Sequence, residues 1–489
     1  MTKFLKQIPR PALAGLLLYF AFRHNFWVLS IFGMGLFYRT LTDQTWRPRL
    51  ISTLSFASAF FFPLLRWIGI LGNDAWILLA TLCIALFTVV AIVPVQSGKL
   101  DSKIEFAIFW CLMELIRSHF PWGGFSWGLV SYAQTSGPLV QYSRIGSSIL
   151  VAFVTVLVAT VVGELRFFRN FWQNWLALGL IIIGLLFPTS SAIGSVQVGV
   201  VQGGVVSSQV PEFARASQVL VHHLEQTRLH TDQLREADFV VWPENSVNLQ
   251  SSSDATSKQI QQVVDEVGKP FLIGAVRENK KGIPQNVVIL WLPKVGQSTS
   301  YVKNHLVPFG EYLPLRKLLA AQIGRFNQIP ADFEPGQGGG VINVAGTKVG
   351  VAICFEVADQ SHLSNLVNAG ATVLVAASNN ATYLGSEQPA QQFEMSRFSA
   401  ITHQRTMVVA TTSGTSGVIS ADGVVSNRVT DSEGHVFVAK VNLSNNVTFG
   451  DRYPKWPFFF VVVATTFFVL HRLRETRRNR EAVGSAERS

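Results

Sequence analysis

The chain begins with long apolar blocks separated by short polar links, and this pattern predicts a membrane domain. The blocks fall at 11–22, 25–37, 50–70, 75–96, 104–120, 147–165 and 171–190, and one more follows at 456–471. Crossing a bilayer core takes about 20 mainly apolar residues, and Trp, Tyr or Arg anchors allow shorter blocks to span it. We therefore expect a membrane domain of about seven helices in residues 1–193 and a final transmembrane helix at 456–471.

Basic residues in the links predict the orientation of these helices. They gather before the first block and after the second, fourth, sixth and eighth: Lys3, Lys6, Arg10, Arg39, Arg47, Arg49, Lys99, Lys103, Arg166, Arg169 and the arginines of 472–489. Lys and Arg concentrate on the cytoplasmic side, so residues 194–455 are expected outside the cytoplasm and the basic tail 472–489 inside it. The alternative, a cleaved signal peptide in residues 1–22, lacks a small-residue cleavage site and would spoil the alternation.

Residues 194–455 have a different pattern, which predicts an α/β domain. Val- and Ile-rich runs begin near residues 195, 237, 269, 286, 348, 371, 406 and 435, with helix-period segments at 212–236, 255–268, 359–369 and 388–405. Strands that are apolar along their whole length are buried on both faces, as in a sheet covered by helices or by a second sheet. The expected fold class is a multi-pass α-helical membrane domain with an α/β exported domain.

Composition agrees with this division and excludes some functions. The chain has 489 residues, of which 48% are hydrophobic, and a net charge of +10, with a mean hydropathy of +0.31. The positive charge lies largely in the links and the tail, where topology and anionic lipid headgroups explain it, so no nucleic-acid partner is expected. His222 and His223 are helix neighbours that point about 100° apart, and "GQGGG" at 336–340 lacks the context of a phosphate loop. We expect neither a metal nor a cofactor.

One cysteine stands apart from the others. Of the three cysteines, Cys83 and Cys111 lie in predicted membrane helices, and only Cys354 lies in the exported domain. An exported compartment is oxidising and usually pairs its thiols, so a single thiol there is either buried and inert or kept for chemistry.

Two charged residues accompany Cys354 at predicted strand ends. Glu244 follows the run "FVVWP", in which Pro243 is expected to end the strand. Lys303 lies in "YVKNHLVPFGEYLP" together with Glu311, and Cys354 follows "VGVAI". Active groups of α/β sheets collect beyond the carboxyl ends of the strands. A buried carboxylate can accept a proton near neutral pH, and an ammonium stabilises a thiolate or an oxyanion. Each residue alone is more often structural, but together they would form an activated nucleophile.

The residues around these positions resemble a known family. "VVWPENS" at 240–246, "KNHLVPFGEYLP" at 303–314 and "AICFE" at 352–356 resemble the Glu, Lys and Cys motifs of the nitrilase superfamily. "KNHLVPFGE" is the form found in the apolipoprotein N-acyltransferase family. "FPWGGFSWG" at 120–128, "VQGG" at 201–204 and "SNNATY" at 378–383 fall where that family has counterparts. The resemblance covers nearly the whole chain.

The resemblance implies a fold, a reaction and a location. Residues 194–455 would form a nitrilase-like αββα sandwich. Glu244 would be the general base, Lys303 the charge stabiliser and Cys354 the nucleophile, with Glu311, Glu356 and Phe355 in support. An acyl chain would pass from a phospholipid, through a thioester on the cysteine, to the N-terminal amine of a diacylglyceryl-cysteine lipoprotein. The chain would reside in the bacterial cytoplasmic (inner) membrane, with the site on the extracytoplasmic side.

The sequence departs from the family at five places that border the acyl pocket or its support. Phe355 replaces a common Tyr, residues 204–206 read Gly-Val-Val for the usual Asp-Ile-Pro, Pro211 replaces a Trp, Thr382 a Trp, and Thr402 a Glu. These changes bear on substrate preference and rate more than on the three central residues. Two other functions stay open, a membrane-tethered amidase or hydrolase and a catalytically degenerate membrane scaffold.

A segment after the Lys motif has the pattern of a lipid-contacting helix. Leu313, Leu315, Leu318, Leu319, Ile323 and Phe326 alternate with basic residues. We expect either an arm that dips into the membrane or an ordinary amphipathic helix on the domain core.

Overall fold

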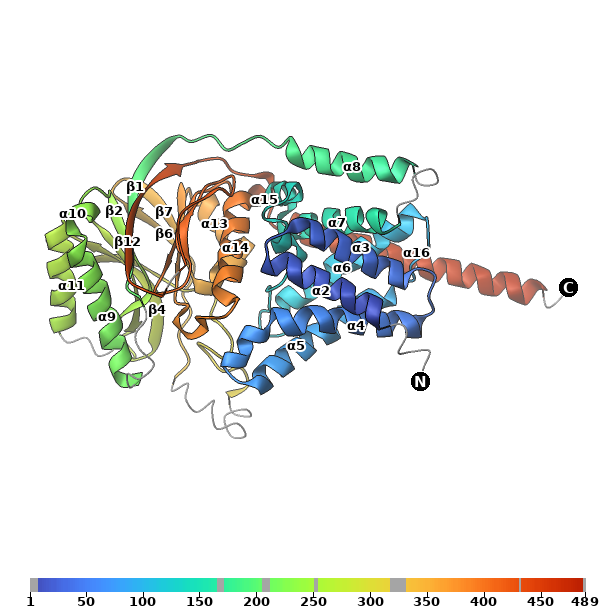
Figure 1. Ribbon diagram of the computed structural model, residues 1–489, viewed down its shortest axis with the longest axis horizontal. Coiled ribbons are helices and arrows are strands. Elements are labelled where there is room, and N and C mark those ends of the chain that lie inside the picture. Colours follow the sequence, from blue (N-terminus) through green and yellow to red (C-terminus); the bar gives the residue numbers. More distant parts are fainter. Residues whose placement is uncertain are drawn as a thin grey trace. The chain divides into compact units, whose positions relative to one another are not determined.

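The computed structural model describes residues 8–164, 171–204, 212–249, 254–316, 331–430 and 432–486. These residues belong to two compact units (Figure 1). The helical unit comprises Met1–Phe187 and Tyr453–Ser489, and the α/β unit comprises Pro188–Arg452.

A helix coincides with each of the eight apolar blocks of the sequence. These helices are α2 (Pro9–Arg23), α3 (Trp27–Leu41), α4 (Trp46–Leu64), α5 (Asn73–Phe87), α6 (Leu100–His119), α7 (Ser143–Gly163), α8 (Phe171–Leu185) and α16 (Trp456–Ala486). Within the described residues, three helical stretches are long and apolar enough to cross a membrane: Asn73–Ile92, Pro138–Gly163 and Trp456–Arg478. Trp27–Leu41 and Phe171–Leu185 are apolar but shorter. The prediction of a helical membrane domain is confirmed.

A buried lysine of the helical unit is paired with a carboxylate. Lys103 lies inside α6 rather than in a link, and its Nζ donates to Glu164 Oε2 at 2.5 Å and to Gln173 Oε1 at 3.0 Å. A buried ammonium needs such partners because losing its hydration is costly. This contact joins α6 to α8 and to the residue that follows α7.

In the part of the α/β unit that the structure describes, the strands form two six-stranded sheets. The first has the order β12-β1-β2-β3-β4-β5 and the second β11-β10-β9-β8-β7-β6. Strands of the first sheet are β1 (Gly194–Gln202), β2 (Phe239–Asn248), β3 (Phe271–Glu278), β4 (Pro284–Leu292), β5 (Gly296–Val302) and β12 (His435–Leu443). Strands of the second are β6 (Val341–Val344), β7 (Thr347–Ile353), β8 (Val373–Ser378), β9 (Met407–Thr411), β10 (Ser416–Ile419) and β11 (Val425–Val429).

The two sheets pack face to face and helices cover their outer faces. Val200 and Val241 of the first sheet share one buried core with Val351 and Val375 of the second. Helices α9 (Glu212–Leu229), α10 (Thr231–Leu234) and α11 (Asp254–Val267) lie against the first sheet, and α13 (Gln360–Asn368) and α14 (Gln388–Thr402) against the second (Figure 1). This is the expected αββα sandwich, which explains why the central strands are apolar on both faces.

Four strands were not expected from the sequence. β5, β6 and β11 lie at sheet edges, where residues can face water, and β10 is only four residues long. None contains the continuous apolar run that identifies the central strands.

The expectation that Pro243 ends its strand is wrong. β2 continues to Asn248, but its pairing with β3 shifts register between Trp242 and Val247. Proline has no N–H to donate to the ladder, so the strand is interrupted there without ending. Glu244 lies in this irregular stretch.

Candidate active site

The three charged or nucleophilic residues singled out in the sequence come from separate strands. Glu244 lies at the irregularity of β2, Lys303 directly follows β5, and Cys354 directly follows β7 as the first residue of the short 3-10 helix η6 (Cys354–Ala358). Lys303 Nζ lies 3.6 Å from Glu244 Oε1. The charges of both residues act on the Cys354 thiol. The structure therefore brings the three side chains together.

Two carboxylates hold the Lys303 ammonium in a buried position. Lys303 is 1% exposed, and its Nζ donates to Glu311 Oε1 at 2.9 Å. Asn286 Nδ2 donates to Glu244 Oε1 at 2.7 Å and to Glu311 Oε1 at 2.9 Å. The Asn379 N–H donates to Glu244 Oε2 at 2.8 Å. Each group is fixed by contacts that do not involve a substrate.

Burial and charge set the protonation of the site. Burial raises the pKa of Glu244, and the neighbouring Lys303 opposes this shift. Burial alone would lower the pKa of Lys303, but the carboxylates of Glu311 and Glu244 raise it above its ordinary value. Burial, with the Glu244 charge, raises the pKa of the Cys354 thiol to about 12. At neutral pH the resting site thus holds a protonated thiol and an ammonium, and the raised pKa of Glu244 suits this group to accept a proton.

Glu356 organises the backbone around the site, and its hydrogen bonds go to neighbouring groups and not to the Cys354 sulfur. Its Oε1 accepts from Tyr301 Oη at 2.8 Å, Asn304 N at 2.8 Å and His305 N at 3.1 Å. Its Oε2 accepts from Ile353 N at 2.8 Å. Glu356 therefore ties the loop that follows Lys303 to the residue that precedes Cys354.

His305, Glu356 and His362 form a cluster whose ligand-type atoms lie within 4.8 Å of one another. The Glu356 oxygens already accept the four hydrogen bonds named above. His362 Nε2 faces the Val351 carbonyl at 3.2 Å, where it serves as a donor. The cluster is therefore explained by hydrogen bonds, and we assign no ion to it.

The turn that contains Cys354 has an unusual backbone. Cys354 has φ +54°, a left-handed conformation that costs roughly 1–3 kcal/mol in a residue other than glycine. Such a conformation persists only where neighbours restrain it. Glu356 holds Ile353 N on one side, and Ser399 Oγ donates to Val357 O at 2.8 Å on the other. Phe355, half-buried, follows Cys354 within this turn.

Three residues of the site were not singled out from the sequence. Asn286 bridges Glu244 and Glu311, as described above. Gln392 on α14 places Nε2 3.8 Å from Cys354 Sγ. Burial raises the pKa of Tyr383 to about 12, and the charges of Cys354 and Glu244 add to the shift, so its hydroxyl also borders the site. Tyr383 lies in the "SNNATY" motif, which was its only sequence signal, and amides such as Asn286 and Gln392 have no distinctive spacing.

The family departures are only partly within the described residues. Thr402 is buried and its hydroxyl donates to the Phe398 carbonyl at 2.8 Å, while Thr382 is exposed next to Tyr383. Residues 205–206 and Pro211 lie outside the described residues, as does most of the expected lipid-contacting segment, residues 317–330.

Comparisons with known proteins agree over both units. Residues 14–161 match the family described as Apolipoprotein N-acyltransferase N-terminal domain, and residues 197–447 match Carbon-nitrogen hydrolase. The apolipoprotein N-acyltransferase of Mycolicibacterium smegmatis is 32% identical over 408 residues, which cover 75% of this chain and 68% of that protein. The enzyme of the same name from Pseudomonas syringae pv. tomato is 24% identical over 466 residues, covering 89% of this chain and 91% of its own.

A solved structure that resembles about half of this chain is a carbon-nitrogen hydrolase. The carbon-nitrogen hydrolase from Helicobacter pylori is 15% identical, covers 54% of this chain and 94% of its own, and has a TM-score of 0.40.

Proposed function

This chain belongs to the apolipoprotein N-acyltransferase family, and on that premise we propose that Glu244, Lys303 and Cys354 carry out its acyl transfer from a phospholipid to a diacylated lipoprotein. The observation that carries this assignment is the buried Lys303 ammonium, which lies between two carboxylates and acts on the adjacent thiol. Such an arrangement suits a nucleophile that must be deprotonated only during reaction.

The first step forms a thioester. Glu244 accepts the proton of the Cys354 thiol while the sulfur attacks the ester carbonyl of the phospholipid. The C–S bond forms, the ester C–O bond breaks, and the proton on Glu244 passes to the departing oxygen, which gives a lysophospholipid. The raised pKa of Cys354 supports this order, because the free thiolate is scarce before the base acts.

The second step consumes the thioester. The amine of the diacylglyceryl-cysteine attacks the thioester carbonyl, and Glu244 accepts a proton from the attacking nitrogen. The C–N bond forms, the C–S bond breaks, and the proton returns to sulfur. In both steps Lys303 stabilises the negative charge that develops on the carbonyl oxygen. Glu311 holds the Lys303 ammonium in place, and Asn286 holds the Glu311 carboxylate, so the site does not reorganise during the reaction.

We place the site on the extracytoplasmic side of the bacterial cytoplasmic membrane. The argument is the alternation of basic and non-basic links along the helical region. A bilayer is also where both proposed lipid substrates dissolve, so an enzyme tethered there meets each of them without extracting it into water.

A labelled phospholipid tests the proposed donor and acceptor. The purified chain, incubated with phospholipid labelled in its acyl chains, is expected to acquire label on Cys354 and to pass it to an added diacylated lipopeptide. Peptide mapping of the trapped thioester and mass spectrometry of the lipopeptide measure the two steps. Release of free fatty acid without transfer to the lipopeptide would favour a hydrolase, and absence of any label would favour a non-catalytic scaffold.

Gln392 is expected to support thioester formation. Gln388 Nε2 donates to Gln392 Oε1 at 3.1 Å, which directs the Gln392 amide N–H toward the sulfur. We predict that Gln392→Ala slows thioester formation about tenfold, since it removes a hydrogen bond to the thiolate that develops during the reaction. Single-turnover acylation measures the rate. Gln391→Ala is the matched control, because Gln391 lies on the same helix and donates to Glu387, the residue that precedes this helix. An equal loss in both variants would contradict a specific role.

A further inference from the structure

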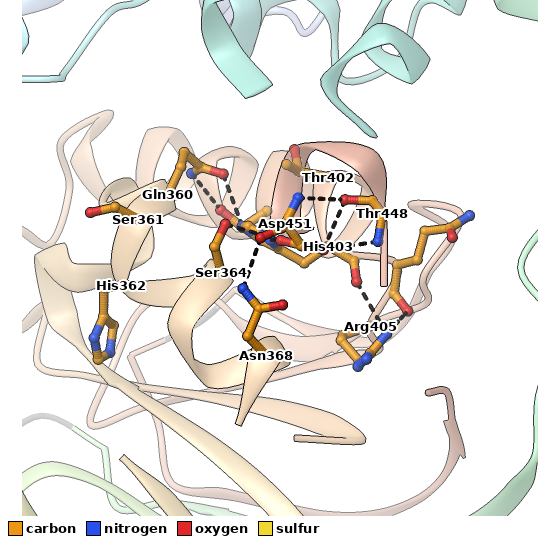
Figure 2. A network of polar contacts seen from close by, with 12 residues as sticks. Gln360, Ser361, His362, Ser364, Asn368, Thr402, His403, Arg405, Thr448 and Asp451 are labelled. Carbon is orange, nitrogen blue, oxygen red and sulfur yellow. Dashed lines mark hydrogen bonds and ion pairs between the residues drawn. The ribbon is translucent and has the colours of Figure 1, made fainter. Parts of the chain in front are cut away.

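A buried ion pair is linked by hydrogen bonds to η6, the short helix that begins at Cys354, and takes no part in the two chemical steps proposed above. His403 Nδ1 lies 2.6 Å from Asp451 Oδ1, and the two side chains are 1% and 0% exposed (Figure 2). Asp451 also accepts from Ser364 Oγ at 3.0 Å and from Thr448 Oγ1 at 2.8 Å. Although burial acts to raise the pKa of Asp451, the His403 charge and these hydrogen bonds lower it below its ordinary value. Asp451 is therefore an ionised partner of His403.

The other cation near Asp451 is engaged elsewhere. Arg405 lies close by in Figure 2, and its guanidinium donates to the carbonyl oxygens of Ala371 at 2.7 Å and Asn446 at 2.5 Å. His403 is the cationic residue bonded to Asp451 within the described residues.

The second ring nitrogen of His403 faces Gln360. His403 Nε2 lies 3.1 Å from Gln360 Oε1. Gln360 Nε2 donates to Ser399 Oγ at 3.0 Å, and Ser399 Oγ in turn donates to Val357 O at 2.8 Å. The Ser399 hydroxyl donates its only hydrogen to Val357 O, so it must accept a hydrogen bond from the Gln360 amide. The Gln360 amide nitrogen therefore faces Ser399, and its oxygen faces His403. Both ring nitrogens then face acceptors, so this geometry requires a proton on each.

These contacts end on the turn that contains the nucleophile. Val357 lies three residues after Cys354 in η6, and its carbonyl accepts from Ser399 Oγ and, at 3.4 Å, from Gln360 Nε2. Cys354 is held in a left-handed conformation, and Glu356 restrains the residue before it through Ile353 N. A restraint on the far side of Cys354 leads through Gln360 and Ser399 to the buried pair.

We propose that His403 is a positioning residue for acyl transfer: paired with Asp451, it orients Gln360, which together with Ser399 fixes Val357 O and so the location of the Cys354 sulfur. This inference rests on the proposed role of Cys354 as nucleophile. It differs from a purely stabilising role, since breaking the link at Gln360 should impair the reaction while leaving the buried pair and the fold in place. Displacement of the nucleophile by about 1 Å can slow the reaction by up to about 10²-fold.

Gln360→Ala in the full chain, reconstituted with labelled phospholipid, tests the link. We expect thioester formation on Cys354 to slow at least about tenfold, with KM for the phospholipid and the thermal unfolding midpoint close to wild type. Asn368→Ala is the matched control, because Asn368 lies on the same helix and donates to the Asp451 main-chain oxygen at 2.8 Å without reaching η6; it should react at the wild-type rate.

Further variants separate the possible failures. Ser399→Ala, which removes the other donor to Val357 O, should slow thioester formation to a similar extent. Asp451→Asn should lower both the rate and the unfolding midpoint, because it removes the counter-charge of a buried imidazolium. Wild-type acylation rates in both Gln360→Ala and Ser399→Ala would overturn the inference. Label on a Cys354→Ala variant would instead refute the proposed nucleophile.

Discussion

Replacing Cys354 by alanine is expected to abolish acyl transfer, with a loss of more than about 10⁴-fold, because it removes the sulfur that would carry the covalent intermediate. The Cys354→Ala variant should still bind phospholipid, because the contacts of Lys303 with Glu244 and Glu311 do not depend on the sulfur. Transfer of a labelled acyl chain to a diacylated lipopeptide measures the effect.

Cys111→Ser is the control for loss of a thiol. Cys111 is buried in α6, and its Sγ donates to Ile149 O at 3.5 Å, a contact that a serine hydroxyl can keep. This variant should retain transfer. Activity in Cys354→Ala near that of Cys111→Ser would reject the nucleophile assignment.

Glu244→Gln is expected to move two properties of Cys354 in opposite directions. Acyl transfer should fall at least about 10³-fold because the base is lost. Burial and then the Glu244 charge raise the thiol pKa to about 12, so a neutral glutamine at residue 244 should lower that pKa and leave more thiolate at pH 8.5. Alkylation of Cys354 by iodoacetamide should therefore become faster, and its rate should begin to rise at a lower pH than in the wild type.

Slower acyl transfer together with faster alkylation distinguishes the loss of a base from a damaged fold. A damaged fold would change both rates without moving them in opposite directions. Glu266→Gln, at a side chain 37% exposed on α11, is the matched control and should change neither. Thioester formation at the wild-type rate in Glu244→Gln would refute its role as base in the first step.

Much of the fold could be predicted because burial leaves a direct imprint on sequence. Strands such as β8 are apolar throughout, with all six residues buried, and such runs marked the sandwich core. β5, with the sequence "GQSTSYV", lies at a sheet edge and carries no such imprint. Lys103 shows a related limit: its charge indicated a link, yet the partner that allows it to be buried, Glu164, is 61 residues away.

The site could be located but not completed from sequence. Glu244, Lys303 and Cys354 were found by their motifs and their positions after apolar runs. Asn286 could not be found this way, because its importance depends on two carboxylates that only the tertiary structure brings to one amide nitrogen. The His403–Asp451 pair likewise joins residues 48 positions apart.

The high pKa of the Cys354 thiol also bears on its resistance to oxidation. Peroxides and disulfides react with thiolates far faster than with thiols. A sulfur that stays protonated between turnovers, beside the negative charge of Glu244, is a poor target for both. In the mechanism proposed above, the same electrostatics delay attack until a base acts, and they would protect the Cys354 thiol from sulfenic acid formation and from mixed disulfides between turnovers.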